Sequence, residues 1–400
     1  MKRPNFLIIG PLAEHVDMLW EYLLSQGYTP LSSANLVRLM ADFSAWLHRK
    51  RLSPTGLTEE QVGCFLRHRR RTYTCWHTRR ALEPIFGCLI KSQVLQLCAS
   101  KCTPRDFPDG MLEQYSEYLS CERNVSDSVN RFYCKTASEF LDKSLKGKGK
   151  LTSLKAADVT NFIFATHQSY SVATCKLVVT ALRSILRFLF ITGKLDRDLS
   201  VAVPAVAGWR LSSLPKSLTR DEVERLLARC DRRTPKGRLS YAVLLLMVRL
   251  GLRACEVAAL TLDEISWREG ELKVRGKGGR VEALPLPRDV GGAISKYIKF
   301  TRQRINSRAV FISTRAPNKG LSSSGVKRIV AVACRKASIS PGGAHRLRHT
   351  TATEMLRKGV PIPKIAQVLR HRDIGTTAIY AKVDYDSLRT VAEPWPGGAA

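Results

Sequence analysis

Residues 345–380 read HRLRHTTATEMLRKGVPIPKIAQVLRHRDIGTTAIY, and this stretch decides how the second half of the chain is interpreted. His345 and Arg348 are three residues apart, so a helix would place both side chains on one face. A second helix is predicted to end at His371, and Tyr380 follows that histidine by nine residues. Four residues of the stretch therefore need a common explanation: His345, Arg348, His371 and Tyr380.

Arg253 and Glu256 lie further upstream, in GLRACEVAAL at residues 251–260, directly after an apolar run that predicts a buried helix. Taken singly, each polar residue has an ordinary explanation. Arg253 could form a surface ion pair with Glu256, and Tyr380 could be a half-buried helix tyrosine. Most such residues are not catalytic, so only the ordered set carries weight.

Lys277 lies in the turn of VRGKGGRV at residues 274–281. Apolar strands flank this turn, and its glycines stand where a hairpin must bend. We therefore expect a small antiparallel sheet near residues 271–286 and 309–313 in an otherwise helical protein.

The charge of the chain points to its partner. Among 400 residues, 65 are Lys or Arg and 34 are Asp or Glu, which gives a formal net charge of +31. These basic residues are spread along the whole chain rather than gathered in a tail. So positive a surface needs a polyanionic partner, and nucleic acid is the first candidate. Charge alone leaves open a protein that binds phosphates without chemistry.

Neither the cysteines nor the apolar residues indicate a secreted or membrane protein. Cys98 and Cys102 form the only close pair, and no histidine or second pair stands at zinc-finger spacing. The longest apolar run, at residues 242–248, is too short to cross a bilayer. We expect a protein of the bacterial cytoplasm, associated with the nucleoid when it acts.

The first two hundred residues predict helices joined by polar turns, including a long amphipathic helix at residues 172–191. LTEEQVGCF at residues 57–65 matches LKAADVTNF at residues 154–162, an offset of 97 residues. We interpret the two segments as parts of tandem copies of one helical unit; chance similarity of amphipathic helices is the alternative. Basic clusters at residues 68–71 and 143–150 suit a DNA backbone.

The polar residues of the second half, taken in order, resemble the catalytic signature of the tyrosine recombinase (phage integrase) family. That signature has an Arg with a nearby acid, a hairpin Lys, a His-x-x-Arg pair, a second His and a Tyr nine residues beyond it. Over roughly residues 215–390 the chain presents the set in this order: Arg253, Glu256, Lys277, His345, Arg348, His371 and Tyr380. The resemblance implies a site-specific DNA recombinase, an integrase or transposase that cuts and rejoins strands through a 3′-phosphotyrosyl intermediate. It also implies that no metal, cofactor or ATP is needed.

The resemblance also suggests a domain plan. Residues 203–218 are rich in Pro, Gly and Ser and predict a linker, after which Thr219-Arg-Asp-Glu222 reads as a capping box that begins a new domain. We expect an N-terminal helical DNA-binding unit at residues 1–107, a core-binding (SAM-like) helical domain at 108–205 and a catalytic tyrosine recombinase domain at 206–400.

The chemistry of phosphodiester cleavage independently suits two arginines and a base. Negative charge gathers on the non-bridging phosphate oxygens, and the guanidiniums of Arg253 and Arg348 can hold these oxygens bidentately. A tyrosine hydroxyl is a weak nucleophile at neutral pH, so Tyr380 needs the help that His345 would supply.

The other three residues take supporting parts in the same reaction. His371 would donate to a phosphate oxygen, and Lys277 would protonate the departing 5′-oxygen. Glu256 would orient Arg253 through a buried pair rather than handle protons.

Family members usually have Gly before the second histidine, whereas Arg370 precedes His371 here, so we expect Arg370 either to add a phosphate contact or to perturb the helix end. Tyr385 is the rival nucleophile, but it lies fourteen residues beyond His371, which does not fit the signature.

The expected partner is double-stranded DNA at specific sites, bound by a homo-tetramer on paired sites, with or without companion recombinases and without a membrane. A type IB topoisomerase, which uses the same chemistry to relax DNA, is the first alternative. A non-catalytic DNA-binding protein is the second. Tandem N-terminal units favour a recombinase over the first, and the intact residue set argues against the second.

Overall fold

The computed structural model describes residues 8–98, 110–145, 151–207, 217–276, 280–302, 305–340 and 342–370, together with residues 375, 377, 379 and 380. The described residues are mostly helical with a small antiparallel sheet, which confirms the predicted fold class. None of the helices in these ranges is long and apolar enough to cross a membrane.

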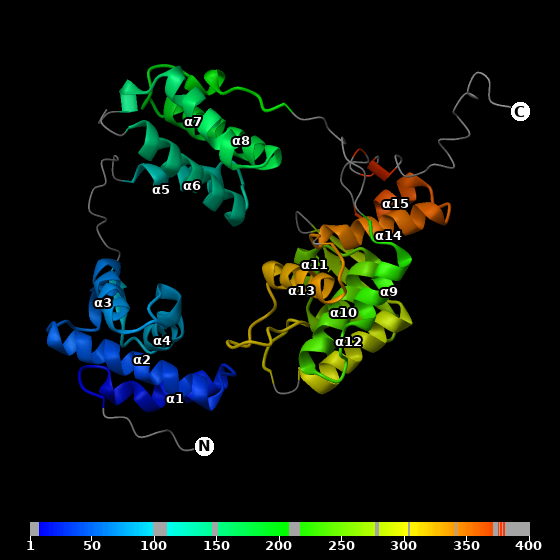
Figure 1. Cartoon of the computed structure of the whole chain (residues 1–400), viewed down its shortest axis with the longest axis horizontal. Coiled ribbons are helices and arrows are strands. Elements are labelled where there is room, and N and C mark those ends of the chain that lie inside the picture. The colour runs from blue at the N-terminus through cyan, green and yellow to red at the C-terminus, as the bar shows by residue number, and fades with distance from the viewer. Residues whose placement is uncertain are drawn as a thin grey trace, which may run out of the picture. The chain divides into compact units, whose positions relative to one another are not determined.

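Residues 8–98 build a helical unit around its own hydrophobic core (blue in Figure 1). The helices are η1 (Ala13–His15), α1 (Val16–Ser25), α2 (Pro30–Arg49), α3 (Glu59–Thr72) and α4 (Arg79–Lys91). The strands β1 (Thr55–Thr58) and β2 (Gln96–Cys98) pair in parallel. These two strands were not predicted, because runs this short show no alternation of apolar and polar residues.

Residues 110–207 fold around a second core that belongs to a separate compact unit, residues 100–212. Its helices are α5 (Met111–Cys121), α6 (Asp127–Ser144), η2 (Leu151–Ser153), α7 (Ala156–Ser169), α8 (Val172–Ile191) and η3 (Leu199–Ala202). Helix α8 has the bounds predicted from the amphipathic pattern, and Ser171 caps it by accepting a hydrogen bond from the backbone of Thr174.

Helices α1 to α4 of the first unit correspond in order to helices α5 to α8 of the second. Helices α3 and α7 begin and end 97 residues apart, and α2 and α6 begin 97 residues apart. The same offset relates two aromatic pairs packed edge to face: Phe43 with Phe65, ring centroids 4.9 Å apart, and Phe140 with Phe162, 5.3 Å apart. Equivalent helices and an equivalent core contact support tandem copies over chance similarity.

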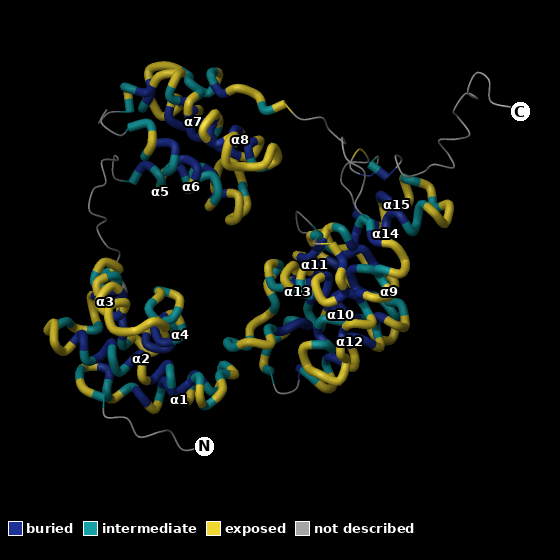
Figure 2. The backbone as a smooth tube through the Cα atoms, viewed as in Figure 1, coloured by how far each residue is buried: buried dark blue, intermediate teal, exposed yellow. Residues whose placement is uncertain are grey.

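Residues 217–370 contain most of the site residues predicted from the sequence. The α-helices are α9 (Arg220–Ala228), α10 (Pro235–Leu250), α11 (Ala254–Ala259), α12 (Arg288–Thr301), α13 (Ser323–Lys336), α14 (His345–Arg357) and α15 (Ile362–Val368), with the short helix η4 (Leu262–Glu264). Half of the residues of α10 are buried, and exposed residues lie on the surrounding helices (Figure 2). The predicted capping box of Thr219 and Glu222 begins α9.

The sheet has three antiparallel strands, β3 (Ile265–Ser266), β4 (Glu271–Arg275) and β5 (Val281–Pro285). The hairpin of β4 and β5 matches the prediction. The expected strand at residues 309–313 is wrong, because Ala309 and Ile312 form only isolated bridges, with Thr261 and Gly320. The apolar residues of that segment are instead buried against the helices.

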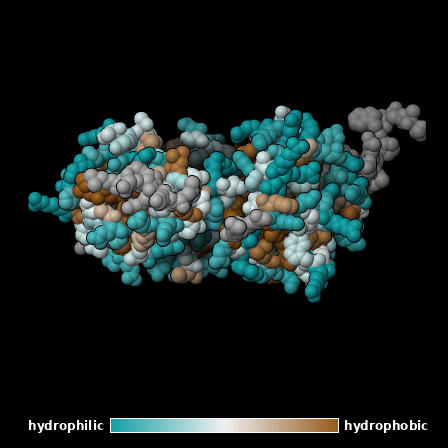
Figure 3. All heavy atoms as spheres, turned by 90° about the horizontal axis from the view of Figure 1, so that it is seen from below, coloured by the Kyte–Doolittle hydropathy of each residue, from teal (hydrophilic) through white to brown (hydrophobic). Residues whose placement is uncertain are grey.

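Hydrophilic residues cover most of the face seen in Figure 3, with smaller hydrophobic areas between them. Such a surface is expected of a chain in which a quarter of the residues are charged.

Candidate active site

Helix α10 ends at a glycine that the site geometry requires. Gly251 has a φ of +59°, and a Cβ at this position would lie 2.7 Å from the side chain of Leu369. Only glycine combines this left-handed conformation with so close an approach. The chain therefore turns sharply here and begins α11 with Arg253 as its N-cap.

Arg253 and Glu256 form the pair predicted from the sequence. Arg253 Nη1 donates to Glu256 Oε1 at 2.6 Å, and the Arg253 backbone N–H donates to Glu256 Oε2 at 2.9 Å. The Glu256 side chain is 2% exposed and that of Arg253 is 30% exposed. Although burial alone would raise it, the pKa of Glu256 is lowered by the backbone hydrogen bond from Arg253 and the charge of Arg370. Glu256 is therefore ionised and suited to holding a guanidinium rather than carrying protons.

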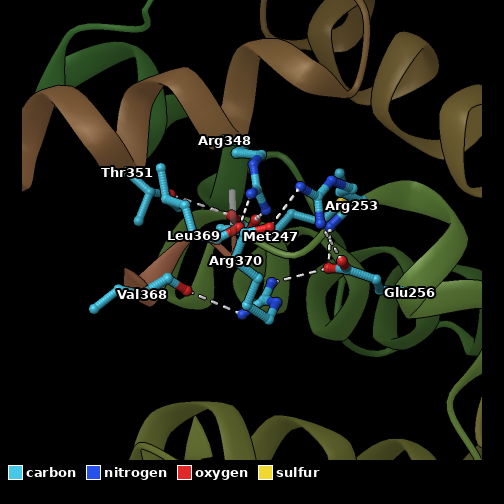
Figure 4. Close-up of polar contacts among 9 residues, drawn as sticks. Met247, Arg253, Glu256, Arg348, Thr351, Val368, Leu369 and Arg370 are labelled. Carbon is cyan, nitrogen blue, oxygen red and sulfur yellow. Dashed lines mark hydrogen bonds and ion pairs between the residues drawn. The ribbon is translucent and has the colours of Figure 1, made fainter. Parts of the chain in front are cut away.

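His345 and Arg348 both lie in the first turn of α14, as predicted. Arg348 is fully buried, and its Nη1 donates to the carbonyl of Gly251 at 2.7 Å while Nη2 donates to the carbonyl of Leu369. Arg348 thus links the end of α10 to the end of α15 (Figure 4). Burial, followed by the charge of Arg253, lowers the pKa of Arg348 to about 9, so it stays cationic at neutral pH.

His345 is the first residue of α14 and is exposed. Surrounding protein atoms that exclude water, and then the charges of Arg348 and Arg253, lower the pKa of His345. Its ring lies edge to face with that of His349, one turn further along the helix, with centroids 4.9 Å apart. His345 is therefore mostly neutral at pH 7 and able to accept a proton.

Tyr380 is buried, and its hydroxyl lies 2.8 Å from Nδ1 of His349. The ring packs in a small cluster with Ile365 and Leu369. Burial raises the pKa of Tyr380 to about 12, against the opposing charge of Arg348. Burial, and then the charges of His345 and Arg348, lower the pKa of His349 to about 4, so its imidazole is neutral at pH 7.

His349 is the residue that the sequence analysis missed. It stood in the quoted motif but had no assigned part, and only its place one turn after His345 on the same helix face could have singled it out. The described contacts bring His349, rather than His345, to the hydroxyl of Tyr380.

Arg370 was expected either to contact a phosphate or to perturb the helix end, and its side chain bonds to other groups of the protein. It follows α15 with a φ of +56°, a conformation that costs a non-glycine residue about 1–2 kcal/mol. Its side chain is 3% exposed, and Nη2 donates to Glu256 Oε2 at 2.9 Å. The expectation of a phosphate contact is not supported by this geometry, because the guanidinium points into the protein (Figure 4).

Three residues named from the sequence lie outside the described residues: Lys277, His371 and Tyr385. The hairpin that would carry Lys277 is described up to Gly276, whose N–H donates to the carbonyl of Arg280 at 2.8 Å. Among the described residues, five lie together where the ends of α10 and α15 meet the start of α14: Arg253, Glu256, Arg348, His349 and Tyr380.

Comparison with known proteins places this arrangement in a family. Residues 216–387 match the phage integrase family, and residues 112–193 match the phage integrase N-terminal SAM-like domain. The Sinorhizobium fredii protein y4rA, named as an integrase/recombinase, is 39% identical over 397 residues, covering 98% of this chain and 96% of that protein. The chain belongs to the phage integrase family of tyrosine recombinases. The resemblance predicted from the sequence is thereby confirmed.

Solved structures share the integrase fold at low sequence identity. The XerH site-specific recombinase bound to palindromic difH, in a post-cleavage complex, has a TM-score of 0.57 at 17% identity and covers 84% of this chain and 94% of its own. A lambda integrase tetramer bound to a Holliday junction has a TM-score of 0.54 at 18% identity, covering 76% of this chain and 87% of its own. At such identities the likeness shows the integrase fold and does not assign residues.

Proposed function

We propose that this tyrosine recombinase cuts and rejoins double-stranded DNA at specific sites through a 3′-phosphotyrosyl link to Tyr380. The observation that carries the proposal is the meeting of two arginines, Arg253 and Arg348, with Tyr380 around the end of α15. Two guanidiniums beside one tyrosine suit an attacked phosphate, because positive donors stabilise the negative charge that develops on its oxygens.

In the proposed step the Tyr380 oxygen attacks phosphorus, and the bond from phosphorus to the 5′-oxygen breaks. Tyr380 is protonated at neutral pH and must lose its proton on attack. His349, neutral and 2.8 Å away, is the nearest acceptor, with His345 beside it. The phosphodiester energy is kept in the tyrosyl link, so a 5′-hydroxyl can reverse the step without ATP.

The described site is closed, because Tyr380 is 1% exposed and Arg348 is fully buried. A DNA phosphate can meet both side chains only after local rearrangement of the protein around them. DNA binding therefore has to supply the free energy that exposes the nucleophile.

The direct test is formation of a covalent adduct by the wild-type chain. Sites bound from a random duplex library would be built into a nicked suicide substrate, which traps the cleaved state. We expect a protease-sensitive adduct that forms equally well in EDTA, because guanidiniums rather than an ion are assigned the electrostatic role. An adduct that needs added magnesium would contradict the mechanism, and site-independent relaxation of supercoiled DNA would favour the topoisomerase alternative.

Lys277 is proposed as the acid that protonates the departing 5′-oxygen. Lys277→Ala should slow cleavage about 100- to 10,000-fold, the usual contribution of a positioned acid. A substrate with a 5′-bridging phosphorothiolate should restore the rate, because its sulfur leaves without a proton. Single-turnover cleavage rates measure both effects, with Lys273→Ala, an exposed lysine of β4, as the control. Absence of rescue would place the acid elsewhere.

We further propose three functional parts: residues 1–107 and 108–205 as DNA-binding units and residues 206–400 as the catalytic domain. In the first unit the predicted basic cluster at residues 68–71 divides in two. Arg69 is buried and pairs with Asp42, which is a structural contact, whereas Arg70 and Arg71 are exposed on α3, as is the neighbouring Arg67. The exposed arginines are the candidates for phosphate contacts.

Replacing Arg67, Arg70 and Arg71 together by Gln should weaken DNA binding. The slope of log affinity against log salt should fall by about one for each lost phosphate contact. The matched control replaces residues 49–51, three exposed basic residues at the C-terminal end of α2, by Gln. Binding titrations over a salt series measure both variants. Equal losses in the two would mean that only net charge matters, and the proposed contacts of α3 would be wrong.

We propose that the working assembly is a homo-tetramer on paired sites, with or without companion recombinases. The lambda integrase tetramer, whose fold is similar, supports this proposal. The bacterial source of y4rA supports action in the bacterial cytoplasm on nucleoid DNA. Mass measurement of the chain on paired selected sites tests the assembly, and a persistent monomer on each site would contradict it.

A further inference from the structure

Arg370 stands where a helix of this kind ordinarily ends in glycine, and its side chain turns inward. The residue follows the C-cap of α15 in the left-handed conformation, and its N–H donates to the carbonyl of Gln367 at 2.9 Å. Its guanidinium donates from Nη1 to the carbonyl of Val368 at 3.1 Å and from Nη2 to Glu256 at 2.9 Å. The side chain thus closes back over its own helix end and reaches α11 (Figure 4).

Glu256 is shared between two guanidiniums. Oε1 accepts from Arg253, and Oε2 accepts from both the Arg253 backbone and the Arg370 side chain. Because each of its two oxygens accepts a hydrogen bond from a guanidinium, the Glu256 carboxylate has little freedom to rotate. The contact with Arg370 therefore limits where the carboxylate can hold the Arg253 guanidinium.

The main chain of Arg370 makes a second, direct connection. Its carbonyl accepts from Arg253 Nη2 at 3.1 Å, and the preceding carbonyl, of Leu369, accepts from Arg348. The carbonyls of Leu369 and Arg370 are consecutive at the end of α15. Each thus accepts a hydrogen bond from one of the two arginines proposed to hold the phosphate. The side chain of Arg370 fixes the end of the helix that presents both carbonyls.

Resting on the proposed function, we propose that Arg370 is a positioning residue that holds the Arg253 guanidinium in place for the attacked phosphate. It acts through Glu256 and through its own carbonyl, and it does not touch DNA. Its ion pair favours this role over a phosphate contact, because Glu256 already balances the charge of the Arg370 guanidinium, whereas Arg348 donates to the neutral carbonyls of Gly251 and Leu369. A purely structural helix end would be served better by glycine.

Arg370→Gly tests the role, because glycine accepts the left-handed conformation while removing the guanidinium. We expect half-site affinity within about threefold of wild type and single-turnover cleavage about 10- to 100-fold slower, since small misplacements of a catalytic group have effects of this size. Arg51→Gly is the matched control. Arg51 also follows a helix C-cap with a φ of +54° and is exposed. Its cleavage rate should equal that of wild type.

Two further measurements separate positioning from a general loss of structure. Millimolar guanidinium chloride should partly restore cleavage by Arg370→Gly, whereas equal sodium chloride should not. In a Glu256→Gln background, Arg370→Gly should have a much smaller effect on cleavage than in wild type, because the Arg370 side chain acts on Arg253 through Glu256 and glycine keeps the main-chain carbonyl. Circular dichroism tests whether each variant is folded. The double variant keeps the comparison informative if one single variant folds poorly.

Several outcomes would overturn the role. Cleavage by Arg370→Gly at the wild-type rate would do so, as would additive losses in the Glu256→Gln background. Loss of half-site affinity with a reduced salt slope would assign Arg370 to a phosphate contact instead. A wild-type chain that forms no adduct would overturn the proposed function and the positioning role together, whereas equal adduct formation by wild type and Arg370→Gly overturns the positioning role alone.

Discussion

Tyr380→Phe should abolish the covalent protein–DNA adduct while leaving the fold and the DNA affinity nearly unchanged. The substitution removes one oxygen, the atom proposed to attack phosphorus, and the loss should be at least about 1000-fold. The phenyl ring keeps its packing against Ile365 and Leu369, and the lost hydrogen bond to His349 costs about 1 kcal/mol of stability. A denaturing gel of labelled suicide substrate measures the adduct, and peptide mapping identifies the linked residue.

Tyr385→Phe is the matched control, because Tyr385 is the rival tyrosine nearest in sequence. It should retain the adduct at the wild-type level. An adduct that survives in Tyr380→Phe, or that maps to Tyr385 or to a serine, would show that the nucleophile has been assigned wrongly.

Arg348→Lys should lower the single-turnover cleavage rate about 100- to 1000-fold, the usual effect of removing one preorganised donor to a developing negative charge. Lysine keeps the positive charge but not the planar fork that bonds two groups at once. In the structure the fork bonds the carbonyls of Gly251 and Leu369, so the variant should also lose about 1–3 kcal/mol of stability. Quenched time courses of single-turnover cleavage measure the loss of rate, and thermal melting measures the loss of stability.

Arg346→Lys provides the comparison within the same helix. The Arg346 side chain is also largely buried, at 15% exposed, but it contacts Ser340 and Glu222 rather than the ends of α10 and α15. Its cleavage rate should stay within about threefold of wild type. Equal losses in the two variants would mean that α14 tolerates no lysine in its first turn, and the proposed role of Arg348 would lose its support.

Periodicity and capping chemistry predicted much of the helical fold. The apolar pattern of α8 and the capping box at Thr219 are local signals, and both elements begin where the sequence indicated. The expected strand at residues 309–313 failed because a short apolar run does not reveal whether a continuous partner strand is available. Local patterns specify elements well and their partners poorly.

In the site, too, local patterns predicted residues on one helix but not the contacts between distant segments. His345 and Arg348 were recognisable from their spacing on one helix. The contact of His349 with Tyr380 joins residues 31 apart in the chain and has no local signature. The inward course of Arg370 depends on a left-handed main chain and on Glu256, 114 residues away. A sequence shows that an arginine replaces the usual glycine, but only the fold shows which way its side chain turns.

The repeated helical unit of the first two hundred residues has a consequence for avidity. If both copies bind DNA, the second contact of each chain forms within an existing complex, at an effective concentration fixed by the connection between the copies. Linked binding of this kind strengthens overall affinity by about 100- to 10,000-fold without any new contact. Each copy can then bind weakly and release its DNA separately, so a long target is recognised while the chain can still exchange strands.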